Sequence, residues 1–326
     1  MGSRIVDVRK LRAQQFQPLL QSESRAWLDD LHWDYGPSAG LISTYLDEKR
    51  LAGFALLEDD LARGYCLYFR EASKGLIGSL FVEPGDSRAG FAVDLLDKAV
   101  NALVSFADVH RIEAQLPHFS PGQLGPYFHS RAFQIYLRQF MAFRLGTSDV
   151  NRPESAAPAG LSRQKGMTGD FVFNPWDRRH DREAAQLVHQ VYRNHIDAAV
   201  NDQYCSLAGA ARLIESIVRN RGCGDFLQHA SIAAIHHSTG KLAGVLGLTA
   251  VRPGTAHIPQ IAVAASYQGA GLGSAMMRAA FEKLAQEGFT EVSLTVTNLN
   301  SGAVRLYERV GFRAFREFGA FVWNRS

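Results

Sequence analysis

The two halves of the chain repeat one order of elements, and this repeat constrains the fold more than any other feature. In each half an apolar strand is followed by a turn, a helix with helical apolar periodicity and an aromatic residue ahead of an aromatic-rich strand. Val82 and Phe128, 46 positions apart, mark the strand end and the aromatic residue in the first half; Val263 and Tyr307, 44 positions apart, mark them in the second. Similar elements at similar spacing predict a duplicated α/β unit. The alternative is that two unrelated α/β halves share the pattern by chance.

The stretch from residue 146 to residue 169 separates the two halves. It contains two prolines and four glycines and almost no large apolar side chains. Such a composition cannot bury enough surface to offset the entropy of ordering it, so we expect a linker. The predicted division is a first domain over 1–146, a linker over 147–168 and a second domain over 169–326. Both domains are then close to the usual size.

Composition excludes several classes of function. The hydrophobic fraction is 46% and the formal net charge is +3, with no cluster of Lys and Arg, so we expect no nucleic-acid partner. The longest apolar run, Leu242–Val251, is about half of the ~20 residues that cross a bilayer, so we expect no membrane insertion. The start shows no secretory signal. Three scattered cysteines form no CxxC pair, so we expect a cytoplasmic protein with neither disulfides nor a metal site.

A glycine-rich turn between a strand and a helix is the strongest local signal. The apolar strand ends at Val263, the turn covers Gln268–Ser274, and an apolar-periodic helix runs from about Gly271 to Gln286. Glycines let a backbone approach phosphate closely, and the amides at a helix start favour anions. A Walker loop is excluded because no lysine precedes Ser274, and the GxGxxG spacing of dinucleotide-binding folds is not met.

The turn instead reads Gln-x-x-Gly-x-Gly at Gln268, Gly271 and Gly273, and a second motif follows it. That motif matches N-x-x-A-x-x-x-Y-x-x-x-G-F at Asn300, Ala303, Tyr307, Gly311 and Phe312. Together the motifs resemble the GNAT superfamily of N-acetyltransferases. The resemblance implies two tandem α/β domains, each a twisted mixed β-sheet flanked by helices, and an acetyl-CoA site in the second. It assigns cofactor binding to Ile261, Ala262, Val263, Gln268, Gly269, Ala270, Gly271, Leu272, Gly273, Ser274, Asn300, Ala303 and Tyr307.

The resemblance also implies catalytic roles. Tyr307 is the expected proton donor to the departing thiolate, against the alternative that it only packs in the core. The backbone amide of Val263 is the expected polariser of the thioester carbonyl. His257 is the candidate general base because an unperturbed imidazole titrates near ~6.5, although a lone histidine is often a satisfied structural residue. Asn300 is expected to hold the cofactor, cap the following helix, or both.

The amine acceptor is expected near the opening helices of the second half. Residues 191–204 are rich in hydrogen-bonding side chains, among which Asp197 and Asp202 suit a cationic amine and Tyr204 suits stacking or hydrogen-bond donation. A solvated helix end is the alternative for each of them. Gln260 could only position a substrate or water. Pro259 lacks an amide, so its strand must bulge or separate from a neighbour there.

The first half resembles a copy that has lost this chemistry. Ser87, Gly90 and Ala92 stand where the second half has Gln268, Gly271 and Gly273; Asp86 enters the turn, and Phe128 replaces the tyrosine. We therefore predict an N-acetyltransferase whose second half moves an acetyl group to a small-molecule or peptide amine by direct attack. The alternative is a non-catalytic acyl-CoA-binding or regulatory module.

Overall fold

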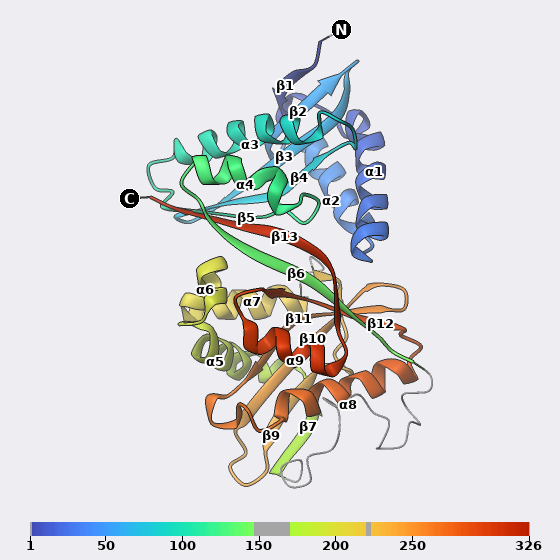
Figure 1. Cartoon of the computed structure of the whole chain (residues 1–326), viewed down its shortest axis with the longest axis vertical. Helices are drawn as coiled ribbons and strands as arrows, with labels where there is room; N and C mark the ends of the chain where they lie inside the picture. Colours follow the sequence, from blue (N-terminus) through green and yellow to red (C-terminus); the bar gives the residue numbers. More distant parts are fainter. Residues whose placement is uncertain (1, 147–169, 220–222, 326) are drawn as a thin grey trace. The chain divides into compact units, whose positions relative to one another are not determined.

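The computed structural model describes residues 2–146, 170–219 and 223–325 (Figure 1). The predicted linker at 147–168 lies outside these ranges. The described chain forms two compact units, residues 1–138 with 316–326 and residues 139–315. The end of the chain, which the linear division assigned to the second half, therefore belongs to the first unit. Strand β6 (Gln134–Arg144) passes from the first unit into the second, and strand β13 (Arg313–Asn324) passes back.

The first unit is a mixed sheet of strand order β1-β2-β3-β4-β5-β13, in which β4 and β5 are parallel and the other pairs are antiparallel. Its elements besides β6 and β13 are β1 (Arg4–Asp7), α1 (Ala13–Leu31), α2 (Gly36–Asp47), β2 (Ala52–Glu58), β3 (Leu61–Glu71), β4 (Lys74–Val82), α3 (Arg88–Val104), β5 (Arg111–Gln115) and α4 (Pro121–Ser130).

The second unit repeats this plan with strand order β7-β9-β10-β11-β12-β6, with short β8 paired to β10 and with β11 and β12 parallel. Its remaining elements are β7 (Phe171–Pro175), α5 (Asp181–Tyr192), α6 (Ile196–Val200), a 3-10 turn at Asp202–Cys205, α7 (Leu207–Arg219), β8 (Asp225–Phe226), β9 (Ile232–His236), β10 (Leu242–Arg252), β11 (Thr255–Val263), a 3-10 turn at Ala265–Tyr267, α8 (Leu272–Gln286), β12 (Glu291–Thr297) and α9 (Ser301–Val310).

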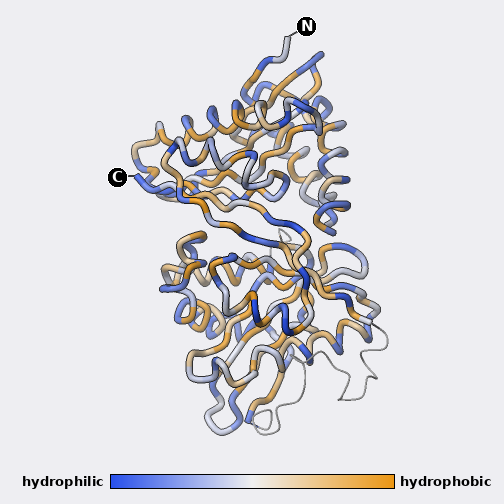
Figure 2. Tube along the Cα trace, viewed as in Figure 1, coloured by the Kyte–Doolittle hydropathy of each residue, from blue (hydrophilic) through white to orange (hydrophobic). Residues whose placement is uncertain are grey.

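Each sheet has helices on both faces, so each unit has two cores. In the first unit α1 and α2 pack on one face and α3 and α4 on the other. In the second unit α5 and α7 cover one face, and α8 and α9 cover the other. Figure 2 shows mostly hydrophobic strands and helices that alternate between hydrophobic and hydrophilic residues, as half-buried helices do. No helix in the described ranges is long and apolar enough to cross a membrane.

One extra residue interrupts the pairing of β11, and this irregularity shapes the site. Gly247 pairs with Gln260 and Thr249 pairs with His257, so Ile258 and Pro259 lie opposite the single residue Leu248. The parallel pairing of β11 with β12 also ends at Ile258. The bulge and strand separation predicted from Pro259 are both present, because proline cannot donate the missing ladder bond. From Gln260 to Val263, β11 pairs with β10 alone.

Candidate active site

Helix α8 begins at a backbone position that only glycine adopts without strain. Gly271, the residue before the helix, has φ of 85°, and Gly269 in the preceding turn has φ of 74°. The first helical bond runs from the amide of Ala275 to the carbonyl of Gly271, and no side chain caps the helix start. The amides of Leu272, Gly273 and Ser274 thus point out of the helix without intrahelical partners. This arrangement suits an anion.

The end of β11 presents backbone groups toward the side that β12 has left. The amide of Ala264 donates to the carbonyl of Ala243 at 2.8 Å, and antiparallel pairs alternate between bonded and non-bonded positions. Ala262 therefore turns its backbone toward β10, whereas Ile261 and Val263 turn theirs away. Consistently, the Ile261 carbonyl accepts from the Tyr192 hydroxyl at 2.7 Å, and the Val263 carbonyl accepts from Gln268 Nε2 at 2.9 Å. The amides of Ile261 and Val263 face the opening between the strands.

Three elements meet at Gly273. A Cβ placed there would lie 3.8 Å from a Val263 methyl on β11 and 3.9 Å from a Leu306 methyl on α9. Both are ordinary contacts, so the start of α8 lies beside both β11 and α9. The predicted cofactor-binding residues of the strand end and the turn are thus brought next to the helix that carries Ala303 and Tyr307.

Tyr307 lies in the core between β11, β12 and α9 and is only 8% exposed. Its ring contacts Phe312 edge-on with centroids 5.8 Å apart. Burial, and after it the negative charge of Asp197, raises the pKa of the Tyr307 hydroxyl. The hydroxyl therefore keeps its proton at neutral pH. The ring of Tyr307 therefore packs in the core while its hydroxyl is close enough to Asp197 to be affected by its charge.

A cluster of aromatic and polar side chains lies on the α5 face of the sheet beside the strand opening. The rings of Tyr192 and Tyr204 stack with centroids 4.7 Å apart. The Tyr204 hydroxyl donates to Gln260 Oε1 at 2.9 Å, and Gln260 Nε2 lies 3.2 Å from the Ile261 carbonyl. Burial raises the pKa of Tyr192 well above its ordinary value. The predicted residues Tyr204 and Gln260 are therefore in direct contact, and Tyr192 both stacks on Tyr204 and bonds to β11 through the Ile261 carbonyl.

The carboxylate in this cluster is the side chain of Asp197. Thr297, the last residue of β12, donates its hydroxyl to Asp197 Oδ1 at 2.6 Å, and His195 Nδ1 lies 3.1 Å from Asp197 Oδ2. The charge of Asp197 contributes to the raised pKa values of both Tyr192 and Tyr307. The carboxylate is thus near the tyrosines on both sides of the strand opening. Asp202 lies in the 3-10 turn beside this cluster and is half-buried.

His257 occupies the predicted strand and is 5% exposed. Its Nδ1 lies 2.9 Å from the Ser293 hydroxyl on β12, and its ring is 6.5 Å from that of Phe140. The Ser293 hydroxyl can also donate to the Ala256 carbonyl at 3.4 Å; when it does so, it accepts from Nδ1–H and the lone pair of the imidazole is on Nε2.

Asn300 caps α9, as one of its two expected roles required. Its Oδ1 accepts from the amide of Ala303 at 3.2 Å, and the helix begins at Ser301. Sequence reasoning did not single out Tyr192, His195 or Thr297. The sequence did contain one signal for Tyr192: it is an aromatic residue at the end of an amphipathic helix, twelve residues before Tyr204.

The counterpart region of the first unit is built differently. Phe128 is fully buried and stacks on Phe321 with centroids 3.7 Å apart, so the position of Tyr307 is apolar there. Ser87 forms no side-chain cap on α3, and the neighbouring Asp86 is exposed. The loss of the tyrosine and of the glycine-rich turn is visible in the local structure.

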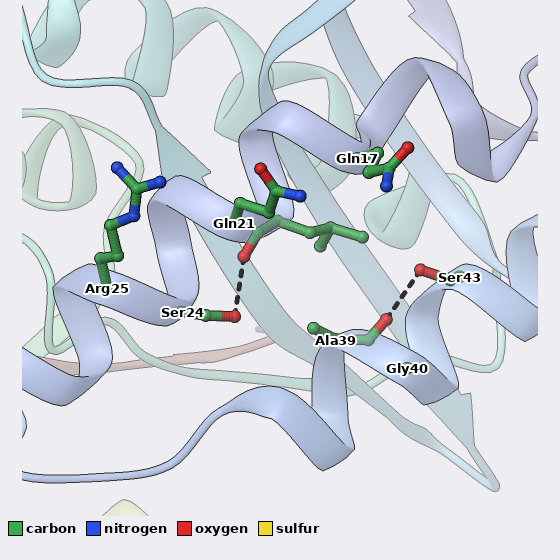
Figure 3. Close-up of a pocket in the computed structure, with 8 residues that line it drawn as sticks. Gln17, Gln21, Ser24, Arg25, Ala39, Gly40 and Ser43 are labelled. Carbon is green, nitrogen blue, oxygen red and sulfur yellow. Dashed lines mark hydrogen bonds between the residues drawn. The ribbon is translucent and has the colours of Figure 1, made fainter.

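A groove between α1 and α2 lies elsewhere in the first unit (Figure 3). Its polar lining includes Gln17, Gln21, Ser24, Arg25 and Ser43. The Ser24 and Ser43 hydroxyls donate to carbonyls of their own helices, at 2.8 and 2.9 Å, and Figure 3 draws both bonds. The groove therefore offers a single charged group and few open hydrogen-bonding positions. Within the described ranges, no three His, Cys, Asp or Glu side chains are grouped so as to hold a metal ion.

Comparison with protein families assigns the second unit. A model of the Acetyltransferase (GNAT) family matches residues 201–312, the segment that contains the strand opening, the glycine-rich turn and Tyr307. The resemblance drawn from the two motifs is confirmed over these residues.

Relatives and solved structures extend the comparison. A mycothiol acetyltransferase from Kocuria rhizophila is 43% identical over 76 residues, which are 21% of this chain and 25% of that protein. The match thus covers about a quarter of the length of that relative. A GCN5-related N-acetyltransferase structure from Sphaerobacter thermophilus has a TM-score of 0.65 and 13% identity, covering 99% of this chain and 95% of that one. A tandem GNAT protein from the clavulanic acid biosynthesis pathway has a TM-score of 0.63 and 15% identity, covering 99% and 98%. At these identities the likeness shows the fold, and the predicted mixed α/β fold is confirmed over 99% of the chain.

Proposed function

We propose that the second unit transfers an acetyl group from acetyl-CoA to a primary amine, with both substrates bound at once. The observation that carries this proposal is the opening between β11 and β12. It combines outward-facing amides of Ile261 and Val263 with a buried, protonated Tyr307 on one side and the carboxylate of Asp197 on the other. A strand opening with unused amides suits an extended polar arm, and a carboxylate beside it suits an ammonium group.

The residues fit acetyl-CoA as a substrate in a defined way. The uncapped amides of Leu272, Gly273 and Ser274 would hold the pyrophosphate, because they are the open positive end of α8. The amides of Ile261 and Val263 would bind the pantetheine arm, and the Val263 amide would polarise the thioester carbonyl. Acetyl-CoA supplies the activated acyl group.

The chemistry assigned to this chain is proton transfer and positioning. The amine nitrogen forms a bond to the carbonyl carbon while the carbon–sulfur bond breaks, and the thiolate takes the proton of the Tyr307 hydroxyl. The proton lost by the amine goes to the candidate base, for which we propose His257 Nε2. In the tautomer in which Ser293 accepts from Nδ1–H, the lone pair of the imidazole is on Nε2. Asp197 first holds the acceptor as an ammonium group, which loses one proton to solvent; the neutral amine then attacks and passes its second proton to His257 Nε2.

The acceptor class follows from the cluster around Tyr192 and Tyr204. Two stacked tyrosines and one carboxylate suit a small amine with an apolar or planar body better than a strongly anionic one. The Kocuria rhizophila relative is named a mycothiol acetyltransferase, so amines of the mycothiol class are one specific probe. A peptide N-terminus carries the same ammonium group and belongs in the same panel.

The test is an acetyl-transfer assay with acetyl-CoA, this amine panel and two matched tyrosine variants. Tyr307→Phe removes only the hydroxyl, so kcat should fall at least about tenfold while acetyl-CoA affinity is retained. Tyr127→Phe, on α4 of the first unit, removes a hydroxyl that contacts Asp97 at 3.4 Å and should leave kcat unchanged. An unchanged kcat in Tyr307→Phe would remove the proton-donor role. Tight acetyl-CoA binding with no turnover on any amine would favour a non-catalytic acyl-CoA-binding module.

A further inference from the structure

The first unit contains a buried histidine whose hydrogen-bonding capacity is unused. His118 lies in the loop between β5 and α4 and is only 4% exposed. Neither of its ring nitrogens has a hydrogen-bond partner. Buried polar groups in folded proteins nearly always have a partner, supplied by protein, ordered water or a ligand. The surroundings of His118 distinguish among these sources.

Aromatic rings pack against His118 on two sides. Trp27 on α1 packs edge-to-face on the imidazole with centroids 5.0 Å apart, and Phe81 on β4 does so at 5.4 Å. These contacts hold the imidazole plane in place. The unpartnered nitrogens are buried with these rings, so a group bonded to them would be held away from bulk water.

Two guanidinium groups face the same histidine. Arg88, the first residue of α3, donates to the His118 carbonyl at 3.2 Å, and Arg316 donates to the neighbouring Pro117 carbonyl at 3.0 Å. Burial, and after it the charges of Arg88 and Arg316, lowers the pKa of His118 to about 3. Arg88 also lies over the Phe119 ring at 4.7 Å, and its Nε is buried without a partner.

This pair of cations is poorly neutralised by the protein. Burial, and then the charge of Arg316, lowers the pKa of Arg88, and the opposing contribution comes from the exposed Asp30. Two positive charges beside a neutral imidazole repel each other, and a bound anion would stabilise both of them. The exposed Asp86 in the turn before α3 disfavours an anion on the helix amides themselves, so the anion would lie on the arginine side chains.

We propose that the first unit binds a small ligand with an oxyanion group, a carboxylate or a phosphate, held between Arg88 and Arg316. One ring nitrogen of His118 bonds a polar atom of that ligand. The site consists of residues of the first unit alone and does not depend on acetyl transfer in the second. The first unit, which has phenylalanine in place of the tyrosine, would then have a role that depends on this ligand.

The experiment titrates the full chain with inorganic phosphate and with citrate at constant ionic strength and follows thermal unfolding. A Gly273→Glu background is used throughout, because an added carboxylate at the start of α8 blocks phosphate binding in the second unit. Arg88→Gln and Arg316→Gln should each weaken the apparent Kd at least about tenfold. Arg4→Gln is the matched control, since it removes an equal charge from an exposed pair with Asp60 and should change nothing.

His118→Phe separates a ligand-binding histidine from a structural one. It keeps the aromatic packing and removes both unpartnered nitrogens. Without ligand its melting temperature should equal or exceed that of the parent, while its stabilisation by phosphate or citrate should be lost. A lower melting temperature without ligand, or unchanged anion affinity in both arginine variants, would overturn the proposal. Loss of all anion response in the Gly273→Glu background would do the same.

Discussion

Glu23 in the first unit carries the sharpest stability prediction. This α1 residue is 1% exposed, and the Tyr65 hydroxyl donates to its Oε2 at 2.5 Å. Burial raises the pKa of the Glu23 carboxyl to about 7, although hydrogen bonds from Tyr65 and Ser79 oppose the shift. The carboxyl is therefore neutral in the folded protein over a pH range in which it is charged in the unfolded chain.

The sign and size of the effect follow by linkage. Between an unfolded pKa of 4.5 and a folded pKa of about 7, the folded state binds one more proton, so the free energy of unfolding falls as pH rises. Each pKa unit corresponds to about 1.4 kcal/mol, which gives a loss of about 3 kcal/mol by pH 8. Glu23→Gln keeps the shape and an acceptor for Tyr65 and removes the titration. Its stability relative to wild type should therefore increase by about 3 kcal/mol between about pH 5 and pH 8.

Scanning calorimetry of both proteins across this pH range measures the difference. For a unit of about 150 residues, 3 kcal/mol corresponds to roughly 5 to 10 °C in the transition of the first unit. Gln17→Glu is the control, because it adds a carboxyl on the exposed side of α1 and should leave the pH dependence unchanged. A constant difference between Glu23→Gln and wild type across the range would show that the folded carboxyl is already charged.

Three further predictions test the site residues. Asn300→Ala should destabilise the second unit by about 1 kcal/mol in urea denaturation because it removes the cap of α9, whereas Asn300→Asp should not; equal losses would mean that the cap contributes nothing. Asp197→Asn should raise KM for the amine at least about tenfold with a smaller change in kcat, and an unchanged KM would remove its role in amine binding. Phe128→Tyr combined with Tyr307→Phe should stay as slow as Tyr307→Phe alone in the transfer assay; recovery of activity would contradict the assignment of chemistry to the second unit.

Sequence reasoning located the parts of the site that depend on short-range signals. The start of α8 follows from the conformation of Gly271, and the start of α9 follows from the cap that Asn300 forms with Ala303. The strand opening follows from Pro259, which has no amide to donate. In each case one residue type and its immediate neighbours determine the backbone, so the pattern alone is informative.

The remaining features depend on contacts between distant residues. The Tyr192 hydroxyl reaches the Ile261 carbonyl 69 positions along the chain, and Thr297 reaches Asp197 across 100 positions. The passage of β6 and β13 between the two units was also missed. Both strands are rich in aromatic and aliphatic residues, and this composition is the same whichever neighbouring strand they pair with.

The most direct measurement of the central claim is calorimetric titration of acetyl-CoA into three proteins, wild type, Gly273→Glu and Gly90→Glu. Gly273 accepts a side chain with only ordinary contacts, and Gly90, near the start of α3, has no atom within 4 Å of an added Cβ, so neither substitution should disturb its helix. The account predicts binding by wild type and Gly90→Glu and at least about a tenfold loss of affinity in Gly273→Glu, because the new carboxylate repels the pyrophosphate. Loss of binding in Gly90→Glu alone, or no binding by wild-type protein free of bound acetyl-CoA, would contradict the placement of the substrate in the second unit.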